Sequence, residues 1–189
     1  MSRIAAVAAA LSSLLAHRGE HVGHIVVSAP ISGRTEATAA QLGNQVGVIP
    51  VTLRTSGRPL DRLGAIADAT RAHKTGTRGA SAALLAPVFR ALAMLGLLRW
   101  LIERQHLVTT FVTNLRGPDA PVSFLGSTIA EVVPLNMVTG NVAVAFAVLS
   151  YAGTLTVTVT VDADAVPESR FLVDALGVEF DALTRGVET

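Results

Sequence analysis

The chain has 189 residues, of which 50% are apolar, and its 15 basic and 14 acidic side chains leave a formal net charge of +1. This length and apolar content predict one folded domain over residues 1–189 and exclude an intrinsically disordered protein. The balanced charge argues against a nucleic-acid partner, and the absence of cysteine excludes disulfides, thiolate metal sites and a cysteine nucleophile.

Residues 2–18 predict an amphipathic helix. Apolar residues recur there at helical spacing, and cations followed by Gly19 mark the end of the helix. A signal peptide is the alternative, because Arg3 precedes a run of alanines, but the polar pair Ser12-Ser13 interrupts the apolar stretch. We therefore expect a helix that packs on the strands behind it. Its apolar positions are Ile4, Val7, Leu11, Leu14 and Leu15.

Two strands and a second helix are predicted next. Residues 21–32 and 45–54 carry β-branched side chains in an extended pattern, and the polar residues 33–43 between them predict a loop. Pro59 then begins a second amphipathic helix, which ends before Gly76.

Residues 80–104 are apolar on nearly all sides. A transmembrane span is disfavoured because Pro87, Arg90 and Arg99 interrupt the run, and an arginine at a membrane centre costs on the order of 2.5–3.5 kcal/mol. We predict a helix pair or a kinked helix that packs on a sheet. The alternative is a surface that contacts lipid or an acyl chain, with three arginines for anionic headgroups and Trp100 for the interface. These arginines are Arg90, Arg99 and Arg104.

The last third of the chain predicts a β-hairpin and a helix. Residues 142–151 and 154–161 are strand-like, the second alternates threonine with apolar residues, and Ala152-Gly153 supplies the turn. A helix follows from Pro167 to Gly186. The elements together predict an α+β fold of two layers, with a mixed, largely antiparallel sheet and helices mainly on one face.

Five short motifs occur in order along nearly the whole chain. They are Ala29-Pro30-Ile31-Ser32-Gly33-Arg34, Leu42-Gly43-Asn44, Thr113-Asn114-Leu115-Arg116-Gly117-Pro118, Ser150-Tyr151-Ala152-Gly153 and Val166-Pro167-Glu168. Together they resemble segments of the bacterial wax ester synthase/diacylglycerol acyltransferase family. The third, at the end of the strand-like residues 107–112, resembles the family's Asn-Val-Pro-Gly-Pro segment, with Leu115 and Arg116 in place of valine and proline.

The resemblance implies the C-terminal lobe of a two-lobed enzyme of the chloramphenicol acetyltransferase and condensation-domain superfamily, with a substrate tunnel between the lobes. The family's catalytic signature is His-His, three residues and Asp-Gly, and this string does not occur here, since none of the five histidines has a histidine neighbour. A second family element, an Asn-Asp pair, is expected immediately upstream of Met1. We therefore expect a chain that is not catalytic alone.

The resemblance also implies partners and location. The substrates are acyl-CoA and either a long-chain alcohol or diacylglycerol, and no cofactor is bound. The protein partner is an N-terminal acyltransferase lobe, with self-association as the alternative, because a missing lobe leaves an apolar surface. A cytoplasmic protein is expected, peripheral to the inner membrane or to lipid droplets.

The substrate-binding residues implied by the resemblance are Asn44, Asn114, Arg116, Gly117 and Pro118. Asn114 can donate or accept a hydrogen bond near the reacting groups, Gly117 allows the backbone to approach substrate, and Arg116 can meet a phosphate of coenzyme A. No catalytic residue and no metal ligand is predicted.

Structural roles compete with these assignments. Taken alone, residues 113–118 favour an ordinary turn at a strand end, and Gly43-Asn44 fits a tight turn equally well. Tyr151 favours a structural role, because a tyrosine before a hairpin turn usually packs and hydrogen-bonds its hydroxyl. His21 and His24 point to opposite faces of a strand, which argues against a metal site. His106 favours a surface or capping role.

Three functions remain open from the sequence: a lobe of an acyltransferase, a stand-alone binding or scaffold lobe, and a lipid-surface module built on residues 80–104. The first is the prediction that we adopt, because the order of the five motifs supports it directly.

Overall fold

The computed structural model describes residues 2–32, 46–55 and 90–185. Within them, five strands form one sheet in the order β2-β1-β3-β6-β7, and β4 and β5 form a small separate hairpin. The helices are α1 (Ser2–His17), α4 (Leu98–Arg104) and α5 (Ser169–Arg185). The strands are β1 (His24–Ser32), β2 (Val46–Arg54), β3 (Thr110–Arg116), β4 (Ser123–Phe124), β5 (Ser127–Thr128), β6 (Val144–Tyr151) and β7 (Thr154–Val161).

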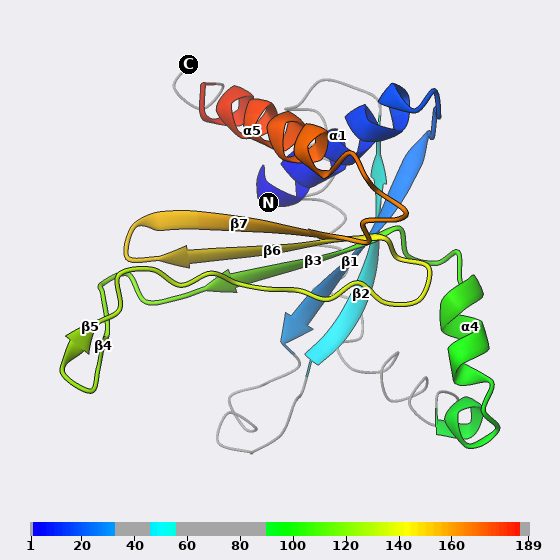
Figure 1. Ribbon diagram of the computed structural model, residues 1–189, viewed down its shortest axis with the longest axis horizontal. Coiled ribbons are helices and arrows are strands. Elements are labelled where there is room, and N and C mark those ends of the chain that lie inside the picture. Colours follow the sequence, from blue (N-terminus) through cyan, green and yellow to red (C-terminus); the bar gives the residue numbers. More distant parts are fainter. Residues whose placement is uncertain (1, 33–45, 56–89, 186–189) are drawn as a thin grey trace.

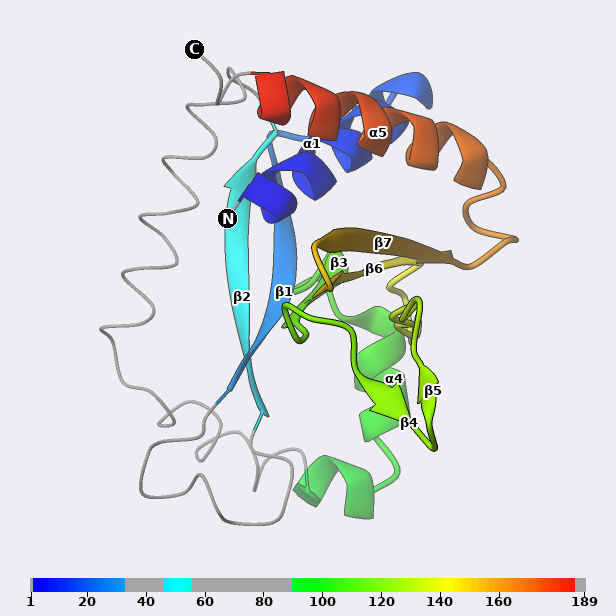
Figure 2. The ribbon, with the colours of Figure 1, turned by 90° about the vertical axis from the view of Figure 1, so that its left-hand side faces the viewer.

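The main sheet is mixed. β1 pairs with β2, and β6 with β7, antiparallel along the whole length of the strands, whereas β3 runs parallel to both β1 and β6. Helices α1 and α5 lie together on one side of this sheet, while α4 and the β4–β5 hairpin lie on the other (Figures 1 and 2). The predicted α+β architecture, with a mixed, largely antiparallel sheet and helices mainly on one face, is confirmed.

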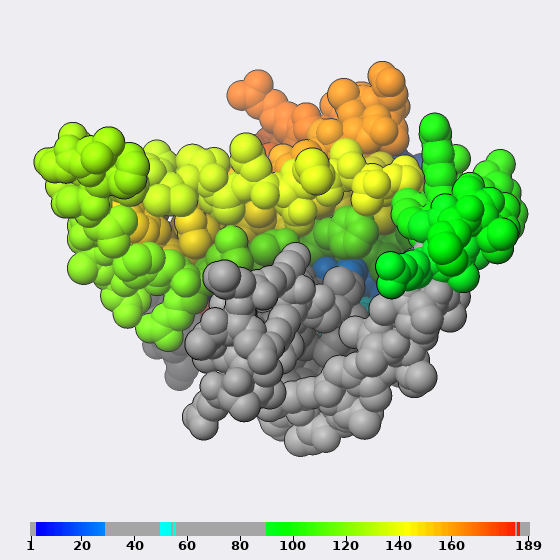
Figure 3. All heavy atoms as spheres, turned by 90° about the horizontal axis from the view of Figure 1, so that it is seen from below, coloured from blue at the N-terminus to red at the C-terminus, as the bar shows by residue number. Residues whose placement is uncertain are grey.

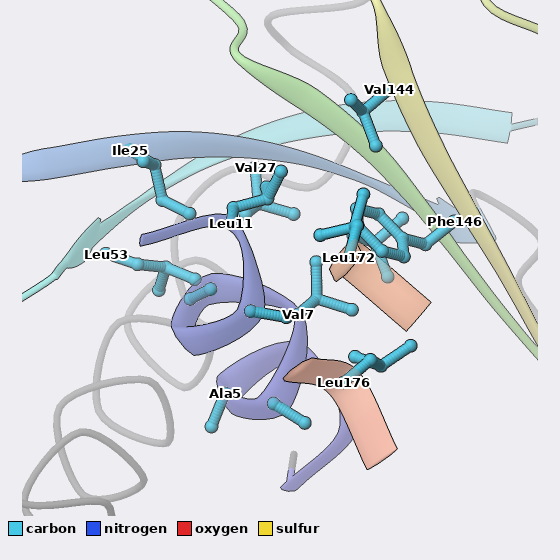
Figure 4. Packing of buried hydrophobic residues seen from close by; sticks show 14 of the residues in the cluster. Ala5, Val7, Leu11, Ile25, Val27, Leu53, Val144, Phe146, Leu172 and Leu176 are labelled. Carbon is cyan, nitrogen blue, oxygen red and sulfur yellow. The ribbon is translucent and has the colours of Figure 1, made fainter. Parts of the chain in front are cut away.

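The core lies between this sheet and the two helices (Figure 4). Every residue from Ala5 to Leu11 is buried, so α1 is enclosed on most of its sides rather than only along the predicted apolar stripe. Alanine side chains make this possible, because they are small enough for a helix to approach both the sheet and a second helix closely. The core side chains are Val7, Leu11, Ile25, Val27, Val112, Phe146, Leu172 and Leu176, among others.

The predicted strands and hairpin are confirmed with shifts of a few residues at their ends. Ala152 and Gly153 both have positive φ angles, 48° and 81°, which is the backbone geometry that a two-residue hairpin turn requires. The predicted loop at residues 33–43 and the predicted helix from Pro59 to Gly76 lie outside the described residues, and the β4–β5 hairpin was not predicted from the sequence.

The core-packing prediction for residues 80–104 is wrong over its described part, 90–104. The break into two helical pieces is present, at a turn where Gly96 has φ 68°. However, α4 has no buried residue, and Met94, Leu95 and Trp100 are 78%, 70% and 56% exposed. None of the described helices is long and apolar enough to cross a membrane.

Helix α4 cannot pack on the sheet because another segment already covers that face. Residues 129–138 run across the sheet on the side away from α1 and α5, and Pro134 of this segment is buried. The helix is attached to the remainder of the fold at its C-terminal end. A Cβ atom at Gly140 would lie 2.5 Å from Ile102, and Gln105 Nε2 donates to Asn141 Oδ1 at 2.8 Å.

An ion pair joins the two core helices. Arg18, directly after α1, donates from Nε to Glu168 Oε1 at 3.2 Å and from Nη2 to Glu168 Oε2 and to the Ala165 carbonyl. The rings of His17 and Phe171 stack beside it, with centroids 4.5 Å apart. The hydrogen bonds from Arg18 lower the pKa of Glu168 and raise the pKa of Arg18. This contact fixes where α5 begins relative to the end of α1.

We predict a pH-dependent contribution of Glu168 to stability. Because its pKa is lower in the folded state, the stabilisation is present above the unfolded pKa near 4.5 and is lost as the pH falls through the folded value. Thermal melting between pH 7 and pH 3 should therefore show a destabilised Glu168→Gln variant at pH 7 and convergence with the unsubstituted protein at the acidic end.

The control is the same substitution in an Arg18→Gln background, where the donor is gone and the pH-dependent difference should disappear. A difference in melting temperature that stays constant down to pH 3 would contradict the assignment.

Candidate functional site

Most of the third motif lies in the last part of β3. We predicted a turn over residues 113–118, but β3 continues through Arg116, and only Gly117 and Pro118 lie beyond the strand. The reason is the parallel ladder with β6, which pairs Phe111 with Ala145 and continues as far as Arg116 with Ser150. Backbone hydrogen bonds to a neighbouring strand override the turn preference of Asn and Gly.

The side chains of the motif alternate between the two faces of the sheet. Val112 points into the core beneath the helices, so Asn114 lies on the helix side and Thr113 on the opposite side. Asn114 is exposed, and its Oδ1 accepts a hydrogen bond of 2.7 Å from Arg3 Nη1 in α1. This bond orients the amide, so that Nδ2 remains as a donor with no acceptor in the described part of the chain.

Gly117 is required by the chain's own packing. Its N–H donates to the Ser150 carbonyl at 2.8 Å, and a Cβ atom at this position would lie 2.7 Å from the same oxygen. The Pro118 carbonyl accepts from the N–H of Ala152 at 2.9 Å. The third and fourth motifs are therefore in direct contact. The close approach of β6 is sufficient to explain why residue 117 is a glycine, without any role in substrate binding.

Among the described residues, Arg116 has a weak partner, Asp119. Its Nη2 lies 3.2 Å from Asp119 Oδ2, and both side chains are largely exposed. An exposed pair of this kind contributes little in water, typically about 0.2–1 kcal/mol. The guanidinium therefore stays available to another anion at little cost.

Tyr151 has the structural role that we predicted. It is buried, its hydroxyl donates to the Ile129 carbonyl at 2.8 Å, and the same oxygen accepts from the N–H of Val122 at 3.0 Å. Both bonds hold the segment 122–129, which contains β4 and β5, against the end of β6. The fourth motif thus supports the position of the third.

Sequence reasoning missed Asn136 and Arg3. Asn136 Nδ2 donates to Thr113 Oγ1 at 3.1 Å and to the Phe146 carbonyl at 3.3 Å, which ties residues 129–138 to the motif strand. A single amide within an apolar run was the available signal for Asn136. Arg3 carried no signal, since its contact with Asn114 joins positions 111 residues apart.

The last candidate binding residue, Asn44, lies outside the described residues, and so do Gly33 and Arg34 of the first motif. No group of three or more potential metal ligands occurs among the described residues. Ser28 is buried on β1, and its hydroxyl has no hydrogen-bond partner in the described part of the chain.

We predict that Gly117→Ala destabilises the fold. The added Cβ would meet a backbone oxygen, which cannot move without disturbing the β3–β6 ladder, so a cost of about 1–3 kcal/mol is expected. Chemical denaturation measures it. The matched control is Gly177→Ala in α5, where a Cβ meets nothing within 4 Å and helix propensity predicts a gain of up to about 1 kcal/mol. Equal effects of the two substitutions would refute the packing argument.

Comparison with known proteins identifies the family. The model of the WS/DGAT C-terminal domain matches residues 42–184. A probable diacylglycerol O-acyltransferase, tgs1, of Mycobacterium tuberculosis H37Rv is 28% identical in an alignment of 191 residues, gaps included, that covers 96% of this chain and 40% of the relative. A putative diacylglycerol O-acyltransferase of Mycobacterium bovis, Mb3154c, gives the same values. The chain thus spans about 40% of the length of these curated relatives.

Solved structures agree on the fold. The wax ester synthase/diacylglycerol acyltransferase of Marinobacter aquaeolei VT8 has a TM-score of 0.72 and 19% identity over 100% of this chain and 43% of that one. The starter condensation domain of rhizomide synthetase RzmA has a TM-score of 0.59 and 19% identity over 95% of this chain and 42% of its own. Because the family match covers three quarters of the sequence, this chain belongs to the WS/DGAT C-terminal domain family.

Proposed function

We propose that this chain is the C-terminal lobe of an acyl-CoA-dependent O-acyltransferase that makes wax esters or triacylglycerols. It forms one wall of the tunnel for acyl-CoA and the acceptor alcohol and is not catalytic alone. The observation that carries the proposal is the family match over residues 42–184, together with the motif strand that ends in two exposed polar side chains, Asn114 and Arg116.

Ester formation sets the chemical requirements. The acceptor hydroxyl attacks the thioester carbonyl, a base takes the hydroxyl proton, donors stabilise the oxyanion, and the coenzyme A thiolate leaves. The family places the base in the His-His-x-x-x-Asp-Gly signature, which is absent from this sequence. A second lobe must therefore supply the base, and this chain supplies binding and orientation.

Asn114 is the residue best suited to a polar role at the reacting groups. Its Oδ1 is held by Arg3, so the amide presents its N–H donors in a fixed orientation. A preorganised donor stabilises a developing oxyanion more than a mobile one does, because no reorganisation is required during the reaction. Arg3 is then a positioning residue for Asn114.

The other proposed residues bind the substrate at its periphery. Arg116 meets a phosphate of coenzyme A, since its present partner Asp119 is exposed and easily exchanged. Gly117 and Pro118 shape the wall next to it through their bonds to β6 and the hairpin turn. Asn44 is retained as a binding residue on the motif alone.

A lipid-surface role is the second candidate, and the exposure of α4 favours it. Met94, Leu95 and Trp100 project from the fold, and the guanidinium of Arg104 lies 5.6 Å from the centre of the Trp100 ring. An aromatic ring and aliphatic groups flanked by arginines suit an interface with anionic lipid. Such a contact would place the lobe on the membrane or droplet in which its acceptor and product dissolve.

We predict acyltransferase activity only when both lobes are present. The substrates are palmitoyl-CoA and either hexadecanol or diacylglycerol. The chain is assayed alone and after co-expression with the segment of the M. tuberculosis relative that does not align with this chain. Turnover that is seen only when both proteins are present supports a split acyltransferase. Turnover by this chain alone would show that catalysis is not missing, and silence in both would favour a binding or scaffold protein.

In the active pair, Asn114→Ala should lower kcat by about 10²-fold, the order expected for the loss of one oxyanion donor. Arg3→Gln should cause a smaller loss that Arg3→Lys partly restores. An unchanged kcat in Asn114→Ala would remove this residue from the reaction.

We also predict binding to vesicles that contain phosphatidylglycerol, weakened by added salt. Replacing Arg99 and Trp100 together by alanine should abolish co-sedimentation, because both side chains are exposed and their loss disturbs no core. The control replaces Val178, exposed on the outer side of α5, by serine. Vesicle binding that survives the double substitution would exclude α4 as the lipid contact.

A further inference from the structure

The main sheet has two edge strands, and one of them carries a feature that prevents pairing with another chain. Among the described residues, β2 and β7 are the outermost strands. Pro50 lies in the middle of β2 and has no N–H to donate, which is a common means of protecting an edge. In contrast, Thr154–Val161 of β7 contain neither proline nor a charged residue, and they pair with β6 without a bulge. The β7 edge is therefore open to a further strand.

The hydrogen-bond pattern shows which backbone groups of β7 point away from the sheet. Asp162 donates from its N–H to the Ala143 carbonyl at 2.9 Å, so this pair is bonded, and bonded pairs alternate with unbonded pairs along an antiparallel ladder. The Ser150 carbonyl instead accepts from Gly117 on the β3 side, so Ser150 and its β7 partner Leu155 form an unbonded pair. In unbonded pairs, the β7 residue turns its N–H and C=O groups away from β6. These residues are Leu155, Val157, Val159 and Val161, and none of their outward groups bonds to another described residue.

Both faces of the sheet carry other elements, in contrast to this edge. Helices α1 and α5 lie on one face, and residues 119–141 form a band across the other, from the β4–β5 hairpin to α4 (Figure 3). Helix α5 packs chiefly against α1 and only slightly against β7. At the start of β7, Thr154 is exposed and Leu155 is 40% exposed. The start of the β7 edge is thus accessible to another molecule.

The side chains of β7 identify a second copy of this chain as the partner. Threonine occupies every second position from 154 to 160, and these side chains lie on the face opposite the helices, because Val157, Val159 and Val161 pack on the core. When two identical strands pair antiparallel about a two-fold axis, residues of the same face meet. Threonine therefore meets threonine, and valine meets valine or leucine, which are pairs that stabilise a sheet. The strand contains no charged residue that would oppose its own copy.

One register pairs the outward groups of residues 155–161 completely. It places Thr158 opposite its own counterpart on the axis, and Thr154 opposite Asp162 of the second copy. This contact uses the same edge in both copies, so it closes at two molecules. Growth through the other edge of the sheet is opposed by Pro50 in β2. The chemistry of the two edges therefore favours a dimer over a fibre.

We infer that β7 is a dimerisation edge, through which two copies of this chain join their sheets into one continuous sheet across a two-fold axis. The inference goes beyond the proposed function, because it concerns the margin of the sheet and neither the tunnel wall nor the second lobe. The motif strand β3 is separated from this edge by β6. Dimerisation therefore does not involve the proposed binding residues Asn114 and Arg116.

The test is the oligomeric state of the purified chain. Light scattering and sedimentation of the unsubstituted protein should show a dimer that dissociates on dilution. Thr158→Lys and Thr158→Asp should each raise the dimer dissociation constant by at least about tenfold, because like charges then face each other on the axis. An equimolar mixture of the two variants should restore the dimer, since opposite charges then meet. This restoration would also show that both variants are folded.

The matched control is Thr52→Lys on the other edge strand. Thr52 is exposed, and it lies on the same face of the sheet as Thr158, because its neighbours Val51 and Leu53 are buried in the core. Its substitution should leave the dimer unchanged. A monomeric unsubstituted chain would overturn the inference. A dimer that both Thr158 variants leave intact, or that Thr52→Lys dissociates as strongly as they do, would overturn it as well.

Thr154 tests the register independently. It is exposed, so substitutions there disturb no packing, and in the proposed register it lies opposite the Asp162 carboxylate of the second copy. Thr154→Lys should therefore tighten the dimer, and Thr154→Asp should weaken it. Equal effects of these two substitutions would overturn the antiparallel pairing of β7. None of these outcomes bears on the two-lobe activity assay, so failure of the inference and failure of the proposed function are distinguishable.

Discussion

The parallel pairing of β3 with β6 is the interaction on which the rest of this structure depends. β3 lies between the β1–β2 pair and the β6–β7 hairpin. It pairs with β6 over most of its length, whereas it pairs with β1 only at Val27 and Ser28. It also carries the third motif as a strand to Arg116 and brings Gly117 against Ser150. A single ladder therefore sets both the sheet order and the position of the polar residues at its end.

The two faces of that sheet are covered by different elements. On one, α1 and α5 exclude water, with an alanine-rich helix fitted tightly against the strands and an ion pair between Arg18 and Glu168 at the join. On the other, one extended segment covers the strands, and both this segment and the exposed short helix α4 turn apolar side chains outward. The two faces thus differ in character: one completes a core, and the other leaves large apolar side chains exposed.

The proposed chemistry follows from the same division. Asn114 lies at the edge of the helix-covered face and is oriented by Arg3 from α1, whereas Thr113 lies on the opposite face and accepts a hydrogen bond from Asn136 in the segment 129–138. Adjacent residues of one strand thus connect to both layers. The position of Asn114, the amide proposed to bind substrate, therefore depends on the helix layer through Arg3 and on the opposite layer through its neighbour Thr113.

The sequence by itself determined the family, the α+β class, the hairpin and the helices at both ends, because period-two and helical patterns, turn residues and short motifs are all local signals. Only the tertiary structure decided that residues 113–116 are strand, that α4 is exposed, and that Arg3 and Asn136 bond to the motif strand. The reason is physical. The hydrogen-bond partners of a backbone or side chain depend on strand pairing between distant residues and on which segment packs against each face of the sheet. The residues next to it in the sequence carry no signal for either.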